Sequence, residues 1–215
     1  MQHLAPQPTD APAGDLLPEI FRRWFAARGW LPRAHQLALL EKAWDDRSAL
    51  LIAPTGAGKT LAGFLPTLVE LSRPFPQVRT TPLPPRSGGE GGDKARGLHT
   101  LYISPLKALA VDVARNLEAP IAEMSLPIKV ETRTGDTPVS RRQRQRRYPP
   151  DILLTTPEQM ALLLASDDAP FLFSSLKRVV LDELHALVTS KRGDLLSLAL
   201  ARLWRLAPRM RAIGL

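Results

Sequence analysis

The segment LIAPTGAGKT, residues 51–60, ends in a Lys-Thr pair that follows two glycines. Gly56 and Gly58 would let backbone N–H groups turn toward phosphate oxygens. Lys59 would reach the outer phosphates of a nucleotide, and the Thr60 hydroxyl would ligate Mg²⁺. The strict pattern has glycine at position 53, where this sequence has alanine, and a glycine-rich turn without a nucleotide is the alternative. We expect a loop that binds ATP with Mg²⁺, formed by Thr55, Gly56, Ala57, Gly58, Lys59 and Thr60.

A second segment with reactive side chains is VVLDELHAL, residues 179–187. An apolar strand there would deliver Asp182 and Glu183 to its carboxyl end, where the phosphates of a bound nucleotide should lie. Two neighbouring carboxylates can divide the work: Asp182 would hold Mg²⁺, and Glu183 would orient and deprotonate the attacking water. The alternative is a helix N-terminus whose acidic residues suit the helix dipole. Together with the loop, the pair predicts a nucleotide hydrolase that uses Lys59, Asp182 and Glu183 in catalysis.

The segments around these residues alternate in a way that predicts an α/β fold. Short apolar runs bounded by turn residues predict strands, and apolar residues at helical spacing predict helices between them. This order is typical of a parallel sheet with helices on both faces, which binds ligands outside the carboxyl ends of its strands. We expect strands at 49–53, 99–104, 128–132, 151–155, 178–182 and 211–215, and helices at 59–72, 106–123, 138–147, 157–165 and 193–207, with further helical spacing at 20–25 and 37–43.

Composition excludes several kinds of protein. The 215 residues include no cysteine, which excludes disulfides and thiolate metal sites. No apolar run approaches the roughly 18 residues of a membrane span, and the N-terminus lacks the pattern of a secretory signal. We therefore expect a soluble, cytoplasmic domain at 16–215 without a membrane partner. A disordered leader is expected at 1–15, and a flexible surface insertion at 73–97, which holds five prolines and five glycines.

The net charge of +8 is concentrated in two segments. Residues 133–147 carry six arginines and one aspartate, or +5, and residues 73–97 carry five basic and two acidic residues, or +3. A basic patch on an otherwise balanced domain indicates a polyanionic partner, with nucleic acid as the first candidate. The run RRQRQRR at 141–147 either extends a nucleic-acid track or forms the solvated outer face of a helix.

The order Asp-Glu-Leu-His at 182–185, together with the loop APTGAGKT, resembles the superfamily 2 helicases of the DExH (DEAD/DEAH-like) type. The segment SKRGDLL at 190–196 is similar to the large-helicase-related (Lhr) group, and within it to the bacterial ligase-associated DExH helicase. The likeness runs from about residue 19 to residue 215. Further segments follow in the family's order: Gly29, Pro32 and Gln36 resemble its Q motif, SPLKAL at 104–109 its motif Ia, TGD at 134–136 its conserved turn, and TPE at 156–158 its motif Ib.

This resemblance implies a RecA-like P-loop domain, the ATP-binding lobe of an ATP-dependent DNA helicase that works in DNA repair. Its partners would be single-stranded or partly duplex DNA, a DNA ligase and a nuclease. In such motors ATP lies between two RecA-like domains, so we expect the second domain to be missing after the strand RAIGL. The chain would then bind nucleotide weakly, hydrolyse it slowly and fail to unwind. The alternatives are an RNA-directed helicase of the same superfamily and a non-catalytic nucleic-acid-binding fragment of a broken gene.

The resemblance also assigns roles to individual residues. Gln36 would read the N6 donor and N7 acceptor of adenine, or is a solvent-facing glutamine of a helix. Trp30 either stacks on the base or packs in the core. His185 would act with the catalytic residues by coupling the ATP site to other parts of the motor, or is an ordinary surface histidine. At strand-to-helix junctions, free N–H groups and side chains would hold nucleic-acid phosphates, unless the hydroxyls there only cap helices. The expected nucleic-acid contacts are Ser104, Pro105, Lys107, Thr134, Gly135, Asp136, Thr155, Thr156, Pro157 and Arg192.

Overall fold

The computed structural model describes residues 16–54, 56–73, 97–188 and 190–215. The expected leader, all of the expected insertion except its two end residues, and Thr55 of the loop therefore lie outside the described residues. Among the helices of the described residues, none is both long and apolar enough to cross a membrane.

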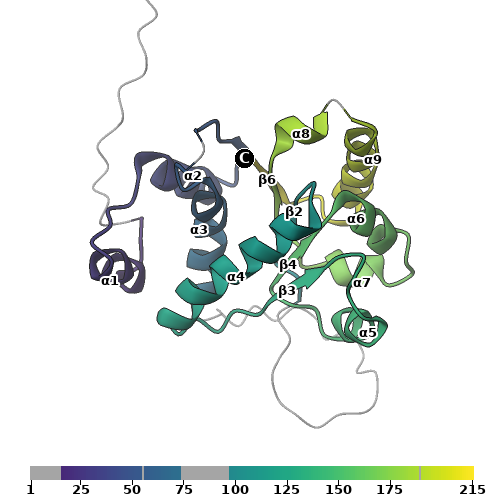
Figure 1. Cartoon of the computed structure of the whole chain (residues 1–215), viewed down its shortest axis with the longest axis horizontal. Helices are drawn as coiled ribbons and strands as arrows, with labels where there is room; N and C mark the ends of the chain where they lie inside the picture. The colour runs from purple at the N-terminus through teal and green to yellow at the C-terminus, as the bar shows by residue number, and fades with distance from the viewer. Residues whose placement is uncertain (1–15, 55, 74–96, 189) are drawn as a thin grey trace, which may run out of the picture.

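Within the described residues, a single sheet of six strands forms the centre of the domain (Figure 1). Every pair of neighbouring strands is parallel, and the spatial order is β1-β6-β5-β2-β4-β3. The carboxyl ends of all six strands therefore meet at one edge, which we call the carboxyl edge. The strands are β1 (Ala49–Leu50), β2 (Thr100–Ile103), β3 (Val130–Arg133), β4 (Ile152–Thr155), β5 (Arg178–Leu181) and β6 (Arg211–Gly214).

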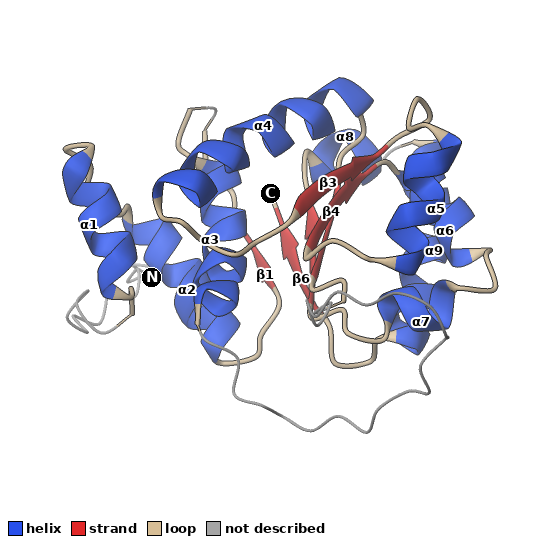
Figure 2. Cartoon of the chain, turned by 90° about the horizontal axis from the view of Figure 1, so that it is seen from below, coloured by secondary structure: helices blue, strands red, loops and turns tan. Residues whose placement is uncertain are grey.

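Helices cover both faces of the sheet (Figure 2). One face is covered by α1 (Glu19–Ala27), α2 (Ala34–Trp44), α3 (Lys59–Ser72) and α4 (Lys107–Glu123), whose apolar side chains pack with Tyr102 and Val180 in one core. The other face is covered by α6 (Pro157–Leu164), α7 (Ala169–Phe173), α8 (Leu184–Val188) and α9 (Lys191–Leu206), which form a second core with Leu101 and Val179. The alternation of neighbouring residues between the two cores follows from the period of two along each strand.

The expected α/β fold, with a parallel sheet between two layers of helices, is confirmed. Strands β2, β4 and β5 are buried at every position, as expected for apolar runs in the middle of such a sheet. All six expected strands are present, although 49–53 shrinks to two residues at an edge, where β1 pairs with β6. Helices α7 and α8, of five residues each, were not expected, because so short a segment cannot show helical periodicity.

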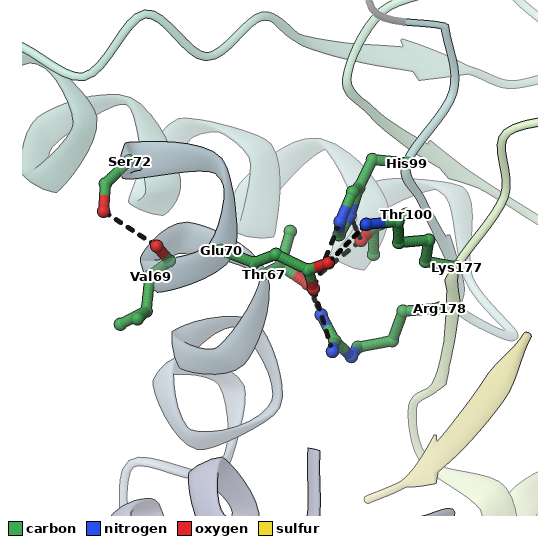
Figure 3. Close-up of polar contacts among 8 residues, drawn as sticks. All are labelled: Thr67, Val69, Glu70, Ser72, His99, Thr100, Lys177 and Arg178. Carbon is green, nitrogen blue, oxygen red and sulfur yellow. Dashed lines mark hydrogen bonds and ion pairs between the residues drawn. The ribbon is translucent and has the colours of Figure 1, made fainter. Parts of the chain in front are cut away.

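A polar cluster ties the sheet to α3 at the edge opposite the carboxyl edge (Figure 3). The Glu70 carboxylate lies 2.7 Å from Lys177 Nζ, 3.3 Å from an Arg178 nitrogen and 3.3 Å from His99 Nε2. Burial alone would raise the pKa of Glu70, but His99, Lys177 and Arg178 hold it well below its ordinary value. Glu70 lies near the end of α3 and His99 just before β2, so the cluster holds together the two ends of the connection between these elements.

Candidate nucleotide and nucleic-acid site

The loop at 53–60 leads from β1 into α3 at the carboxyl edge. Gly56 and Gly58 have φ values of +79° and +73°, in the left-handed region that glycine enters without a steric cost. Gly58 is the N-cap of α3, a helix of 14 residues, and Lys59 is its first residue. The first N–H groups of a helix have no partner within it, and together with the helix dipole they favour an anion such as a phosphate. The backbone conformation thus fits the phosphate-binding loop that the sequence predicts.

Asp182 follows β5 at the same edge and is 6% exposed. Its carboxylate accepts a hydrogen bond from the hydroxyl of Tyr102, a side chain of β2 that is fully buried. Burial raises the pKa of Asp182, while Tyr102 and the positive charge of Lys59 act against that rise. The charge of Lys59 in the loop thus acts on the Asp182 carboxylate. We did not expect a role for Tyr102, because a tyrosine in an apolar strand resembles an ordinary core residue.

The backbone turns sharply after Asp182. Glu183 has φ of +48°, which is uncommon for a residue with a side chain and costs on the order of 1 kcal/mol or more. Its carboxylate is 39% exposed and lies 3.3 Å from Nε2 of His185, whose side chain is 78% exposed. The turn therefore separates the two acidic side chains, one buried beside the loop and one open to solvent beside His185. This separation suits the different tasks that the sequence predicts for Asp182 and Glu183.

A cavity of about 570 Å³ opens beside the loop. Its size is that of a typical small-molecule site. Its walls come from the segment before α2, the start of α3 and the middle of α4, and they include Gly29, Trp30, Arg33, Gln36, Gly58, Thr60 and Asn116.

Gln36 in this cavity is not the solvent-facing glutamine that was the alternative, since it is 3% exposed. Its Oε1 accepts a hydrogen bond of 2.9 Å from the Arg33 backbone, and its Nε2 lies against Gly58, where an added Cβ would come within 3.3 Å. Trp30 is 52% exposed and therefore does not pack in the core. Arg33, which sequence reasoning missed, also donates to the Gly56 carbonyl at 3.3 Å. These contacts join the Q-motif segment to the phosphate-binding loop.

The oxygen atoms present at the loop fit Mg²⁺. Thr60 supplies a hydroxyl at the start of α3, and Asp182 supplies a carboxylate from the adjacent part of the carboxyl edge. Mg²⁺ prefers hard oxygen ligands and is held in nucleotide sites by one or two protein groups together with phosphates and water. Two protein ligands of this chemistry are enough for such a site.

The expected nucleic-acid contacts lie at the carboxyl ends of β2, β3 and β4, which are neighbours in the sheet. The exposed side chains of Lys107 and Asp136 form an ion pair of 2.7 Å, which joins the segments after β2 and β3. Arg192 in α9 donates to the Pro105 carbonyl at 2.9 Å and pairs with Glu158 at 2.6 Å, which joins the segments after β2 and β4. The structure therefore brings the predicted segments together into one surface, although Asp136 adds a negative charge to it.

The hydroxyl groups of this surface differ in their accessibility. Ser104 and Thr155 are fully buried, and the Thr155 hydroxyl donates to the Arg133 carbonyl at 2.7 Å. Thr134 and Thr156 are 6% and 7% exposed. Thr156 is the N-cap of α6, yet its side chain makes no capping hydrogen bond. Capping therefore does not explain Thr156, and phosphate contacts by these four residues stay predictions. Gly135 beside them is exposed, and Pro157 begins α6 as a buried residue.

The arginine-rich run forms α5 (Val139–Arg147), and its arginines have partners within the domain. Glu131 of β3, 4% exposed, accepts from Arg144 and Gln145 at 2.8 Å each and lies 3.4 Å from Arg141. Arg142 donates to the carbonyls of Gly135 and Thr137 at 2.6 and 2.7 Å. The run is thus not a plain solvated face, because Arg142 holds the TGD turn and Glu131 anchors the helix, and a contact of the run with nucleic acid stays a prediction. The sequence signal that could have predicted this anchor was Glu131, an acidic residue in the strand before the arginine-rich helix.

Comparison with known proteins gives one consistent result. The family described as DEAD/DEAH box helicase matches residues 33–214. Over 208 residues the chain is 40% identical to the Lhr helicase/uracil glycosylase of Escherichia coli, covering 87% of this chain and 12% of that protein. It is 38% identical over 206 residues to the ATP-dependent helicase Lhr-Core of Methanothermobacter thermautotrophicus, covering 92% of this chain and 22% of that protein.

Solved structures show the same likeness. The helicase Lhr of Mycobacterium smegmatis, solved with ssDNA and AMP-PNP, superposes with a TM-score of 0.78 at 35% identity, over 92% of this chain and 24% of that one. The DUF1998 helicase MrfA, solved with DNA and AMPPNP, gives 0.73 at 26% identity, over 98% of this chain and 26% of that one. The chain thus spans about a quarter or less of each of these four proteins.

Proposed function

The chain belongs to the DEAD/DEAH box helicase family, and on that premise we propose that it is the ATP-binding lobe of an Lhr-type helicase that acts on DNA. One observation carries the proposal. The strand order β1-β6-β5-β2-β4-β3 divides the carboxyl edge into two halves. The loop around Lys59 and the Asp182–Glu183 pair lie after β1 and β5, and the nucleic-acid segments lie after β2, β4 and β3. Nucleotide and nucleic acid can therefore bind side by side on one lobe.

In the nucleotide half, the loop Thr55–Thr60 and the start of α3 bind the phosphates of ATP, and Lys59 neutralises their charge. Thr60 and Asp182 hold Mg²⁺, which when bound would stabilise the charge on the transferred phosphoryl group. Glu183, turned away from Asp182 by its backbone conformation, orients and deprotonates the attacking water, while His185 holds its carboxylate. Gln36 reads the adenine edge through its amide, and the exposed Trp30 packs against the base.

In the nucleic-acid half, we propose that single-stranded DNA follows the segments 104–107, 134–136 and 155–157, with Arg192 at their junction. Contacts from backbone N–H groups and from Lys107 to phosphates carry no base sequence information, as a translocating enzyme requires. DNA is favoured over RNA because the two described structures above 25% identity contain ssDNA or DNA.

We propose further that these 215 residues bind Mg²⁺-ATP but hydrolyse it slowly and do not unwind DNA on their own. In other NTPases an arginine finger contributes about 10³–10⁵ in turnover, and it can come from outside the phosphate-binding domain. DNA repair beside a ligase and a nuclease is the cellular role that we propose for this helicase.

Two measurements on this chain test the proposal. The first compares the anisotropy of a labelled DNA strand and of an RNA strand of equal sequence, titrated in Mg²⁺-AMP-PNP at one salt concentration. Tighter DNA binding is expected, and tighter RNA binding would assign the lobe to RNA. The second measures steady-state ATP hydrolysis with and without DNA, beside Glu183→Gln. Fast DNA-stimulated turnover that is lost in Glu183→Gln would show that the lobe is catalytically complete and would contradict slow hydrolysis.

A further inference from the structure

A buried side-chain hydrogen bond crosses the boundary between the two halves of the carboxyl edge. The boundary lies between β5 and β2, which are neighbours in the sheet, with Ile103 opposite Leu181. Ser104 and Asp182, the next residue of each strand, therefore leave the sheet side by side. Tyr102 lies two residues before Ser104, so its side chain is on the same face of the sheet. From there its hydroxyl reaches the carboxylate of Asp182.

Two hydrogen bonds at this boundary have a defined donor and acceptor. The N–H of Leu106, the N-cap residue of α4, donates to the Ser104 hydroxyl oxygen at 3.4 Å. Ser104 lies two residues after Tyr102 on the same face of the sheet, so Leu106, Ser104 and Tyr102 form a path toward Asp182. The path ends in the hydrogen bond that the Tyr102 hydroxyl donates to the Asp182 carboxylate. Ser104 and Tyr102 are fully buried and Asp182 is 6% exposed, so bulk water does not replace these bonds.

The tyrosine ring is fixed independently of its hydroxyl. It stacks on Phe64 of α3 with ring centroids 5.3 Å apart and an interplanar angle of 28°. Phe64 lies five positions after Lys59 on the helix that starts at the phosphate-binding loop. Packing alone would therefore be served by phenylalanine at position 102, and the hydroxyl has a separate purpose that packing does not explain.

We propose that Tyr102 is a positioning residue, which holds the Asp182 carboxylate in the orientation that binds Mg²⁺ and couples it, through Ser104, to the nucleic-acid segment at 104–107. This inference rests on the proposed function, because it assumes that Asp182 binds the metal of ATP. Hydrogen-bond partners of metal ligands generally contribute about 10–100-fold to metal affinity. DNA that moves the start of α4 would alter the bond from Leu106 to Ser104. By reciprocity, Mg²⁺-ATP would change DNA affinity by the same factor.

The experiment uses Tyr102→Phe in this chain, with Tyr148→Phe, an exposed tyrosine at the end of α5, as the matched control. The affinity for a fluorescent ATP analogue is measured in Mg²⁺ and in EDTA, each with and without a single-stranded DNA oligonucleotide. In Mg²⁺, Tyr102→Phe should bind the analogue about tenfold more weakly than the unmodified chain, whereas affinity in EDTA should not change. The effect of DNA on nucleotide affinity should shrink, and Tyr148→Phe should match the unmodified chain in all four conditions.

A second variant, Ser104→Ala, should reduce the effect of DNA on nucleotide affinity. In the double variant this effect should be no smaller than in Tyr102→Phe, because both residues act along the same path to Asp182. Equal weakening of Tyr102→Phe in Mg²⁺ and in EDTA would mean that the hydroxyl only supports the fold, and this overturns the proposal. An unchanged Mg²⁺ dependence overturns it as well. If the unmodified chain itself fails to bind Mg²⁺-ATP, the proposed function fails first, and the tyrosine inference fails with it.

Discussion

Replacing Glu131 with glutamine should destabilise the domain by about 2 kcal/mol. The carboxylate is 4% exposed and accepts two hydrogen bonds of 2.8 Å, from Arg144 and Gln145. Hydrogen bonds to a charged group contribute about 1.5–3 kcal/mol each and neutral ones about 1, so weakening two of them gives a loss of about 1–4 kcal/mol. We expect about 2 kcal/mol, in the lower half of this range, because Arg144 is 53% exposed and the ion pair is partly screened by solvent.

The stability lost in Glu131→Gln should also depend on pH. Burial acts to raise the pKa of Glu131, but the hydrogen bonds from Gln145 and Arg144 outweigh it and lower the pKa below its ordinary value of 4.5. A carboxyl whose pKa is lowered by folding stabilises the protein above the pKa of the unfolded chain. That stabilisation is lost as the pH falls below 4.5 toward the lowered value. The difference between the unmodified chain and Glu131→Gln should therefore be constant near pH 7 and shrink below about pH 4.5.

Thermal denaturation followed by circular dichroism measures both effects. For a domain of this size, about 2 kcal/mol corresponds to a fall of roughly 4–8 °C in melting temperature. Glu118→Gln, which removes an exposed carboxylate from α4, is the control and should change little. A fall in Glu131→Gln no larger than in Glu118→Gln, or a difference that persists undiminished at pH 3, would refute the assignment of Glu131 as the anchor of α5.

Three further predictions concern other contacts. Arg142→Gln removes the donors that hold the TGD turn, so DNA affinity should fall with an unchanged salt slope in anisotropy titrations; a slope reduced by about 1 would place Arg142 on the phosphate track instead. Gly193→Ala should cost about 1–3 kcal/mol in urea denaturation, because the new Cβ would lie 2.2 Å from the Leu187 carbonyl oxygen. Gly135→Ala, with nothing within 4 Å, is its control, and equal effects would contradict the reasoning. Deleting residues 74–96 should leave the melting temperature within a few degrees, since Glu70 ties α3 to His99 and Lys177; a large fall would show that this segment packs.

The sequence predicted the sheet well because its strands are short apolar runs between turn residues, a pattern that few other structures produce. It predicted the nucleotide half for a different reason. The loop with Lys59 follows one predicted strand, and the pair Asp182 and Glu183 follows another. Because the carboxyl ends of parallel strands meet at one edge of the sheet, the sequence was enough to place these residues at the same edge. The nucleic-acid segments were likewise placed by their strands, and their roles stay predictions.

What the sequence did not predict depends on contacts between distant residues. The bond from Tyr102 to Asp182 requires β2 and β5 to be neighbours, and no local pattern specifies that order. The burial of Gln36 depends on the close approach of Gly58. The run 141–147 taken alone did not indicate the anchor at Glu131, because the partner of its arginines lies in the preceding strand and the ion pairs form between the two segments.

Equilibrium binding of Mg²⁺-ATP to this chain, measured by isothermal titration calorimetry beside Lys59→Ala, is the decisive experiment on the nucleotide half. We expect one site per chain in the unmodified protein and loss of detectable binding in Lys59→Ala, with an unchanged melting temperature in the absence of nucleotide. Equal affinity in both proteins would contradict the assignment of residues 53–60 as the phosphate-binding loop.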